Sequence, residues 1–133
     1  MDSRTASCRC GQLTATVVGE PVRVSVCHCL NCKKRSGSAF AVQARWPESQ
    51  VTITGQSKTF VMVADSGNRG TYHFCPECGS DVFYENAGKF DGLVAIPLGA
   101  FDDPYFASPK FSVWEKRKCD WVEILGDAVE HRD

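Results

Sequence analysis

The sequence predicts a mainly β fold in one domain of about ten short strands. The chain has 133 residues, which is the length of a single domain. Short segments rich in β-branched and aromatic residues recur along it, separated by Gly, Pro, Asn and Asp. A helical pattern is confined to one brief segment. These three observations indicate a β domain rather than an α/β or helical one.

The elements follow in chain order. Residues 13–18 are rich in β-branched side chains and end at Gly19-Glu20-Pro21, which predicts a strand and a turn. Residues 22–26 alternate apolar and polar side chains, the period of a half-buried strand. A short helix is expected over 30–36, with Gly37 suited to end it. The remaining strands are expected at 40–46, 51–54, 59–63, 71–74, 82–84, 93–96, 111–114 and 121–125.

Composition and charge narrow the classes of partner. The chain is 43% hydrophobic and 23% charged with a formal net charge of −1, so no overall field attracts a polyanion. We therefore expect no nucleic acid as partner. No segment approaches the roughly 20 apolar residues of a membrane span, and the N-terminus lacks the apolar core of a signal peptide. We expect a cytoplasmic protein with reduced thiols.

Eight cysteines are the outlying feature of the composition. In a reducing compartment such a number favours metal binding over disulfides. The pair Cys75 and Cys78, followed by Gly79, has the spacing of a zinc knuckle. The other clusters are Cys8 with Cys10, and Cys27 with Cys29 and Cys32.

The residues between the cysteines of each C-x-C pair are expected to be non-ligands. On an extended chain, positions i and i+2 share one face while the residue between them points the other way. Arg9 and His28 occupy these middle positions.

The count of ligands leaves one place open. Two tetrahedral sites need eight ligands, and the three clusters supply seven. If Cys8 and Cys10 join the knuckle, the remaining three cysteines form a site with a free position, the pattern of a catalytic metal. Alternatively Cys119 completes that site and both are structural, or Cys119 is a free thiol. Spacing alone does not decide among these possibilities.

The motifs resemble those of one family. They are Cys-x-Cys-Gly near the N-terminus, Cys-x-Cys-x-x-Cys followed by Gly37-Ser38-x-Phe40, and Phe74-Cys75-x-x-Cys78-Gly79. The stretch 96–104 and Trp121 fit the C-terminal pattern. Over about residues 7–125 the chain is similar to the glutathione-dependent formaldehyde-activating enzyme family, which includes centromere protein V.

The resemblance implies a zinc-binding β-tent of several short antiparallel strands that holds two zinc ions. Cys8, Cys10, Cys75 and Cys78 match the positions that bind a structural zinc, and Cys27, Cys29 and Cys32 match those that bind a catalytic one. The implied activity is that of a carbon–sulfur lyase, which condenses glutathione or a related thiol with formaldehyde or another small aldehyde. A non-catalytic zinc-binding or thiol-binding module is the alternative.

Basic residues follow the third cysteine of the central cluster. Three thiolates give a zinc site a net charge of −1, and a bound thiolate would make it more negative. Lys33, Lys34 and Arg35 are therefore the candidates to balance this charge and to meet the carboxylates of glutathione, unless they form a solvated basic turn.

Overall fold

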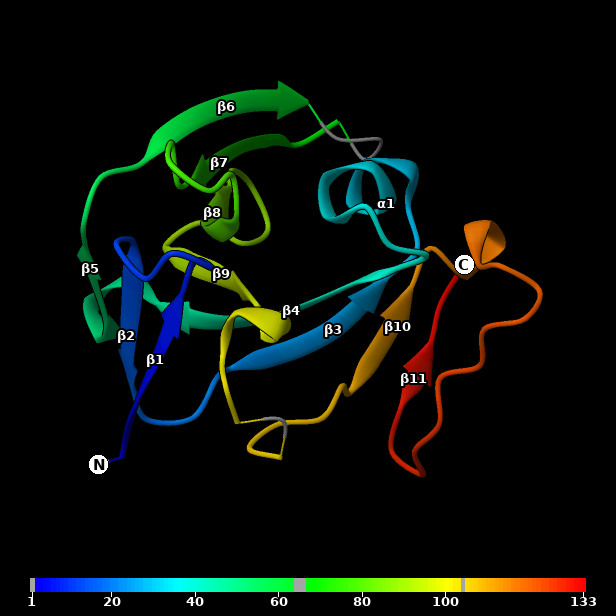
Figure 1. The fold of residues 1–133 in the computed structure, drawn as a ribbon. Helices are drawn as coiled ribbons and strands as arrows, with labels where there is room; N and C mark the ends of the chain where they lie inside the picture. The colour runs from blue at the N-terminus through cyan, green and yellow to red at the C-terminus, as the bar shows by residue number, and fades with distance from the viewer. Residues whose placement is uncertain (1, 64–66, 104) are drawn as a thin grey trace.

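The computed structural model describes residues 2–63, 67–103 and 105–133, so Pro104 of the C-terminal motif lies outside the described residues. The strands and the single α-helix are shown in Figure 1. They are β1 (Ser3–Ser7), β2 (Thr14–Val18), β3 (Arg23–Cys27), α1 (Leu30–Ser36), β4 (Ala41–Pro47), β5 (Val51–Thr54), β6 (Lys58–Val63), β7 (Arg69–Phe74), β8 (Asp81–Asn86), β9 (Leu93–Pro97), β10 (Phe111–Val113) and β11 (Glu130–His131). Short 3-10 turns occupy Glu48–Gln50, Leu98–Ala100 and Glu115–Arg117.

The strands form two sheets. One has the order β1-β2-β5, and the other has the order β11-β10-β3-β4-β9-β8-β7-β6. Most neighbours are antiparallel, but β10 runs parallel to both β3 and β11. The predicted mainly β class is confirmed, with this parallel edge as an addition. Within the described residues, no helix is long and apolar enough to cross a membrane.

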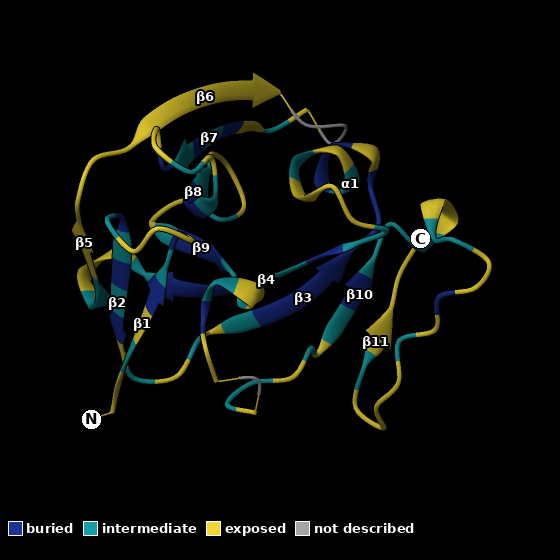
Figure 2. Ribbon diagram, viewed as in Figure 1, coloured by how far each residue is buried: buried dark blue, intermediate teal, exposed yellow. Residues whose placement is uncertain are grey.

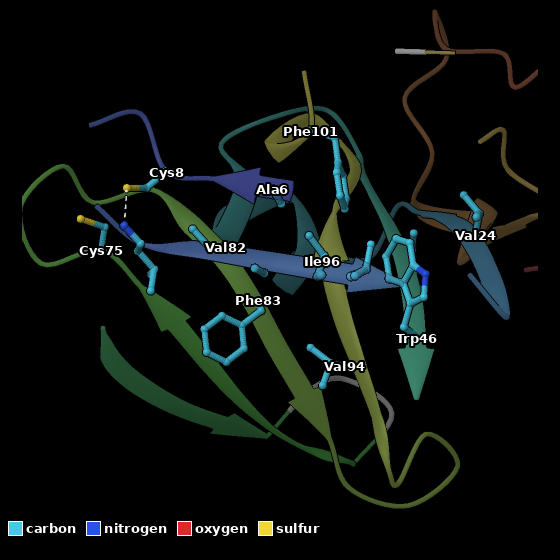
Figure 3. Close-up of a cluster of buried hydrophobic side chains, with 14 residues drawn as sticks. Ala6, Cys8, Val24, Trp46, Cys75, Val82, Phe83, Val94, Ile96 and Phe101 are labelled. Atoms are coloured by element: carbon cyan, nitrogen blue, oxygen red, sulfur yellow. Dashed lines mark hydrogen bonds between the residues drawn. The ribbon is translucent and has the colours of Figure 1, made fainter. Parts of the chain in front are cut away.

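The core lies where the small sheet covers one face of the large one. Ala6, Ala15 and Val17 from the small sheet join a cluster with side chains from β3, β4, β8 and β9 (Figure 3). Trp46 is fully buried there, with its ring centroid 5.7 Å from that of Phe101. Figure 2 shows the contrast between the buried central strands and β6, which is exposed along its whole length.

Alternation along β3 and β4 separates this core from a polar face. On β4, Ala44 and Trp46 enter the apolar cluster, and Val24 does so from β3. The residues that alternate with these along the two strands, including Arg23 and Arg45, therefore point to the opposite face. Helix α1 joins β3 to β4 (Figure 1).

Helix α1 has the predicted bounds, because its two caps are encoded locally. Cys29 is the N-cap, and its sulfur accepts a hydrogen bond from the N–H of Cys32 at 3.3 Å. At the other end Gly37 has φ 69°, a left-handed conformation that glycine adopts without steric cost. Its N–H donates to the carbonyl of Lys33 at 2.8 Å.

Nine of the ten predicted strands are confirmed, with ends that differ by two residues at most. The prediction of a strand at 121–125 is wrong, because that segment is irregular. Only Val122 in it is buried, while Trp121 and Leu125 are 78% and 82% exposed. Strands β1 and β11 were not predicted, and each is defined mainly by pairing with a neighbour.

Burial predicts a large difference between two tryptophans. We expect Trp46→Ala to lower the free energy of unfolding by about 3–5 kcal/mol, because it leaves a large cavity in the core. It also removes the hydrogen bond from Trp46 Nε1 to the carbonyl of Gly19 at 3.0 Å. Trp121→Ala is the matched control and should change stability by less than about 0.5 kcal/mol. Urea unfolding followed by circular dichroism measures both, and equal losses would contradict this description of the core.

Candidate functional site

Four cysteines from two distant loops meet at one point. Cys8 and Cys10 follow β1, and Cys75 and Cys78 lie between β7 and β8. The four sulfurs all lie within 4.8 Å of one another. The Cys8–Cys10 and Cys10–Cys75 sulfur distances are 3.6 Å and 3.7 Å. A tetrahedral zinc with bonds of about 2.3 Å requires sulfurs about 3.8 Å apart, so the group fits this ion.

The two loops of this group fold in a similar way. Gly11 N–H donates to the carbonyl of Cys8 at 3.1 Å, and Gly79 N–H donates to that of Cys75 at 2.8 Å. Gly79 has φ 79°, which a side chain would disfavour. Each loop thereby curls its two sulfurs toward the common point.

Hydrogen bonds to sulfur support these thiols as thiolate ligands. Backbone N–H groups of Leu13 and Glu77 donate to the sulfurs of Cys8 and Cys75 at 3.3 Å and 3.4 Å. The Gln12 side-chain amide also donates to Cys75 at 2.9 Å. Donors around a ligand sulfur orient it and spread its negative charge.

A second group consists of three buried cysteines. Cys27 ends β3, Cys29 caps α1, and Cys32 lies in its first turn. The three sulfurs lie within 4.8 Å of one another, and their residues are 6%, 5% and 9% exposed. Strand β3 and helix α1 thus hold three soft ligands in one place, which suits a thiophilic divalent cation.

The three thiols share their protons unequally. Hydrogen bonds from Cys27 and then Cys32 lower the pKa of Cys29 well below its usual range. The same contact with Cys29 raises the pKa of Cys27 well above its usual range. One thiolate is therefore already favoured in the group before any cation is added.

No fourth ligand joins the three sulfurs within the described residues. Cys119 stands apart from the group, and its sulfur lies 3.8 Å from the Nζ of Lys33. His28 also takes no part, as expected from its middle position. It is fully buried, and its Nε2 hydrogen-bonds with the Oγ of Ser112 at 2.9 Å.

A cavity of about 120 Å³ opens beside the three cysteines. Its floor is the polar face of β3 and β4, and its walls come from α1, β7, β8 and the segment after β10. The side chains around it are Arg23, Ser25, Cys27, Cys29, Asn31, Cys32, Arg35, Gln43, Arg45, Asn68, Tyr72, Tyr84, Asn86, Phe90, Val113 and Trp114. None of them is acidic, so the cavity is suited to an anionic or polar ligand.

The predicted basic residues fall in different places. Arg35 lines the cavity and pairs with Asp81 at 3.3 Å. Burial lowers the pKa of Arg35. The charges of Tyr84, Cys32 and Asp81 raise it by a larger amount, so the pKa of Arg35 lies above its ordinary value. Arg35 is therefore a fixed positive charge close to the cysteines.

The two lysines do not line this cavity. Lys33 donates to the carbonyl of Arg117 and approaches Cys119 on another side of the helix. Lys34 is exposed and borders a separate hollow next to β6.

Two further arginines at the cavity were missed by sequence reasoning. Arg23 and Arg45 lie directly opposite each other on β3 and β4. The sequence contains a signal for Arg23, because Arg23, Ser25 and Cys27 occupy every second position of one strand and must share a face. Which residues of β4 join that face depends on a pairing register that the sequence does not display.

The chain is similar to known proteins in its fold and in its sequence motifs. A structural-genomics crystal structure of a Rhodobacter sphaeroides protein aligns with a TM-score of 0.57 and 17% identity, over 75% of this chain and 91% of that chain. At that identity the likeness concerns the fold alone. No curated protein sequence is significantly similar to the chain. The family model described as glutathione-dependent formaldehyde-activating enzyme matches residues 3–117, and the chain belongs to that family.

Proposed function

We propose that residues 1–133 form one zinc-binding domain that catalyses addition of a thiol to an aldehyde, and the reverse cleavage, as a carbon–sulfur lyase. Glutathione and formaldehyde are the proposed pair, in keeping with the family. The observation that carries the proposal is the group of three buried cysteines beside a polar cavity. Eight free thiols are compatible with the reducing cytoplasm as its location.

The two cysteine groups have different proposed roles. Cys8, Cys10, Cys75 and Cys78 supply four ligands and would hold a structural zinc. Cys27, Cys29 and Cys32 supply three ligands and would hold a second zinc. Bound there, zinc would supply Lewis acidity to a fourth ligand such as a thiol or an aldehyde oxygen.

The reaction forms one bond and moves one proton. The sulfur of the thiol bonds to the aldehyde carbon as the π bond of the carbonyl breaks, and its electron pair moves to the oxygen. The proton that leaves the sulfur reaches that oxygen. Arg35 offsets the negative charge that the cysteines and a substrate thiolate bring together.

Tyr72 is the proposed donor to the developing oxygen anion. Its hydroxyl oxygen accepts a hydrogen bond from the amide of Asn31 at 3.0 Å, which leaves the hydroxyl proton free to be donated. Tyr72 also lines the cavity.

Metal content tests the assignment of the two groups. We expect two zinc ions per wild-type chain by native mass spectrometry, with one ion more easily removed by a chelator because it has fewer protein ligands. Cys32→Ser should retain one ion, whereas Cys119→Ser should retain both. A loss of zinc in Cys119→Ser would show that this residue is a ligand after all.

Turnover tests the catalytic role. With glutathione and formaldehyde, and with a panel of other thiols and aldehydes, wild-type protein should exceed the uncatalysed rate. Cys32→Ser should fall to the background, while Cys119→Ser should match the wild type, since Cys119 lies outside the group. Circular dichroism and zinc content confirm that each variant is folded. Equal rates for wild type and Cys32→Ser would end the catalytic proposal, and thiol binding without turnover would identify a binding module instead.

A further inference from the structure

Two positive charges, those of Arg23 and Arg45, face each other at the end of the cavity away from the cysteines. The register of β3 and β4 pairs Arg23 with Arg45, Ser25 with Gln43, and Cys27 with Ala41. Like charges that are directly opposite on neighbouring strands destabilise a sheet. Arg45 is only 5% exposed, so water screens this repulsion poorly.

Arg45 has no acidic partner among the described residues. Its guanidinium donates to the side-chain oxygen of Asn86 at 3.3 Å and lies 4.0 Å from the ring centroid of Phe90. It takes part in no ion pair of the described structure. A neutral amide and an aromatic ring hold the group in place but leave its charge uncompensated.

Arg23, which is half-buried, also takes part in no ion pair of the described structure. Its guanidinium lies 3.9 Å from the ring centroid of Phe111, and its Nε is buried without a hydrogen-bond partner. Burial lowers the pKa of Arg23, the positive charges of Arg45 and Arg132 lower it further, and the negative charge of Glu130 partly opposes them. The nearby acid Glu130 is engaged by Arg132 at 2.9 Å.

The cysteines are too far along the strand to compensate these two arginines. Arg23 precedes Cys27 by four residues, which corresponds to about 13 Å along an extended chain. The cation next to the cysteines is Arg35, which has Asp81 as its own partner at 3.3 Å. Arg23 and Arg45 therefore have no ion-pair partner among the described residues, and an anionic ligand in the cavity would supply one.

The Ser25–Gln43 pair lies between the two arginines and Cys27, and it offers a hydrogen-bond acceptor. Gln43 is 3% exposed, and its Oε1 is buried without a partner. Its Nε2 donates to the Oγ of Ser25 at 3.2 Å, so the oxygen is left to accept from a ligand. An unpaired acceptor in such a place costs stability that a bound N–H or O–H would recover.

We propose that Arg23 and Arg45 form a carboxylate-binding subsite, and that these two residues select a thiol substrate whose carboxylate lies one residue beyond its cysteine. Its carboxylate lies between the two guanidinium groups, its amide N–H donates to Gln43, and its sulfur lies at Cys27, Cys29 and Cys32. A cysteinyl peptide with a free C-terminal carboxylate presents these three groups in this order. The placement of the sulfur rests on the proposed function, whereas the carboxylate subsite does not.

The first test compares two ligands that differ only in the carboxylate. Calorimetry on the zinc-loaded full chain would measure binding of cysteinylglycine and of cysteinylglycine amide, with no aldehyde present. The free acid should bind at least about tenfold more tightly, because charge-assisted hydrogen bonds to Arg23 and Arg45 are lost in the amide. This preference should fall below about twofold in Arg45→Gln and in Arg23→Gln, while Arg4→Gln, a charge-matched change on β1, should retain it. Arg23 is less buried than Arg45, so Arg23→Gln keeps the test open if Arg45→Gln is unstable.

The second test uses molecules without sulfur. N-acetylglycine should shift the Nε–H signals of Arg23 and Arg45 in nitrogen-15 spectra, and N-acetylglycine amide should not. Inorganic phosphate is included to separate carboxylate recognition from general oxyanion binding, and a stronger response to phosphate than to the acid would overturn the carboxylate assignment.

The outcomes separate the subsite from the proposed function. If the acid moves the arginine signals but neither cysteinyl ligand binds more tightly than its sulfur-free counterpart, the subsite stands and the thiol chemistry fails. If the thiols bind with no preference for the carboxylate, and the arginine signals do not move with the acid, the subsite is refuted.

Discussion

The antiparallel register of β3 and β4 is the constraint on which the rest of the structure depends. It sends Val24 and Ala44 into the core and presents Cys27, Gln43 and Arg45 on the opposite face. A slip of one residue would exchange the two faces, burying the arginines in the core and exposing its apolar side chains. Core packing therefore fixes the register, and the register in turn fixes the floor of the cavity.

The two cysteine groups bring together different parts of this framework. The four-cysteine group ties the loop after β1 to the loop between β7 and β8, and so connects the small sheet to the large one. The three-cysteine group joins the end of β3 to the start of α1, which are neighbours in the chain. A metal bound to the first group would close a long loop, whereas a metal bound to the second would constrain little of the chain. This difference fits a structural role for the first and a reactive one for the second.

Local signals in the sequence were sufficient for most elements. Helix α1 was predictable because Gly37 provides its C-cap, and the central strands were predictable because their side chains alternate. Strand β1 was not, since its sequence SRTAS has no apolar run and pairs with β2 through backbone bonds and a Thr5–Thr16 contact of 3.0 Å. The segment 121–125 has strand-like composition, but only Val122 of it packs inward.

The site was predictable where ligands lie close in the chain. The spacing of Cys27, Cys29 and Cys32 indicated a common point, and the structure brings their sulfurs together. The pairing of Arg23 with Arg45 could not be inferred, because it depends on which residues of two strands lie opposite each other. Proximity in sequence likewise suggested Lys33 and Lys34, yet the helix directs them away from the cavity.

The most direct test of the central claim is X-ray absorption at the zinc edge of the fully loaded protein. A closed group of four cysteines and an open group of three predict an average of about 3.5 sulfur ligands per zinc without added thiol. Addition of glutathione should raise the average toward four. Four sulfurs per zinc before any thiol is added would show that a side chain completes the second site, and the proposed chemistry would then have no place to occur.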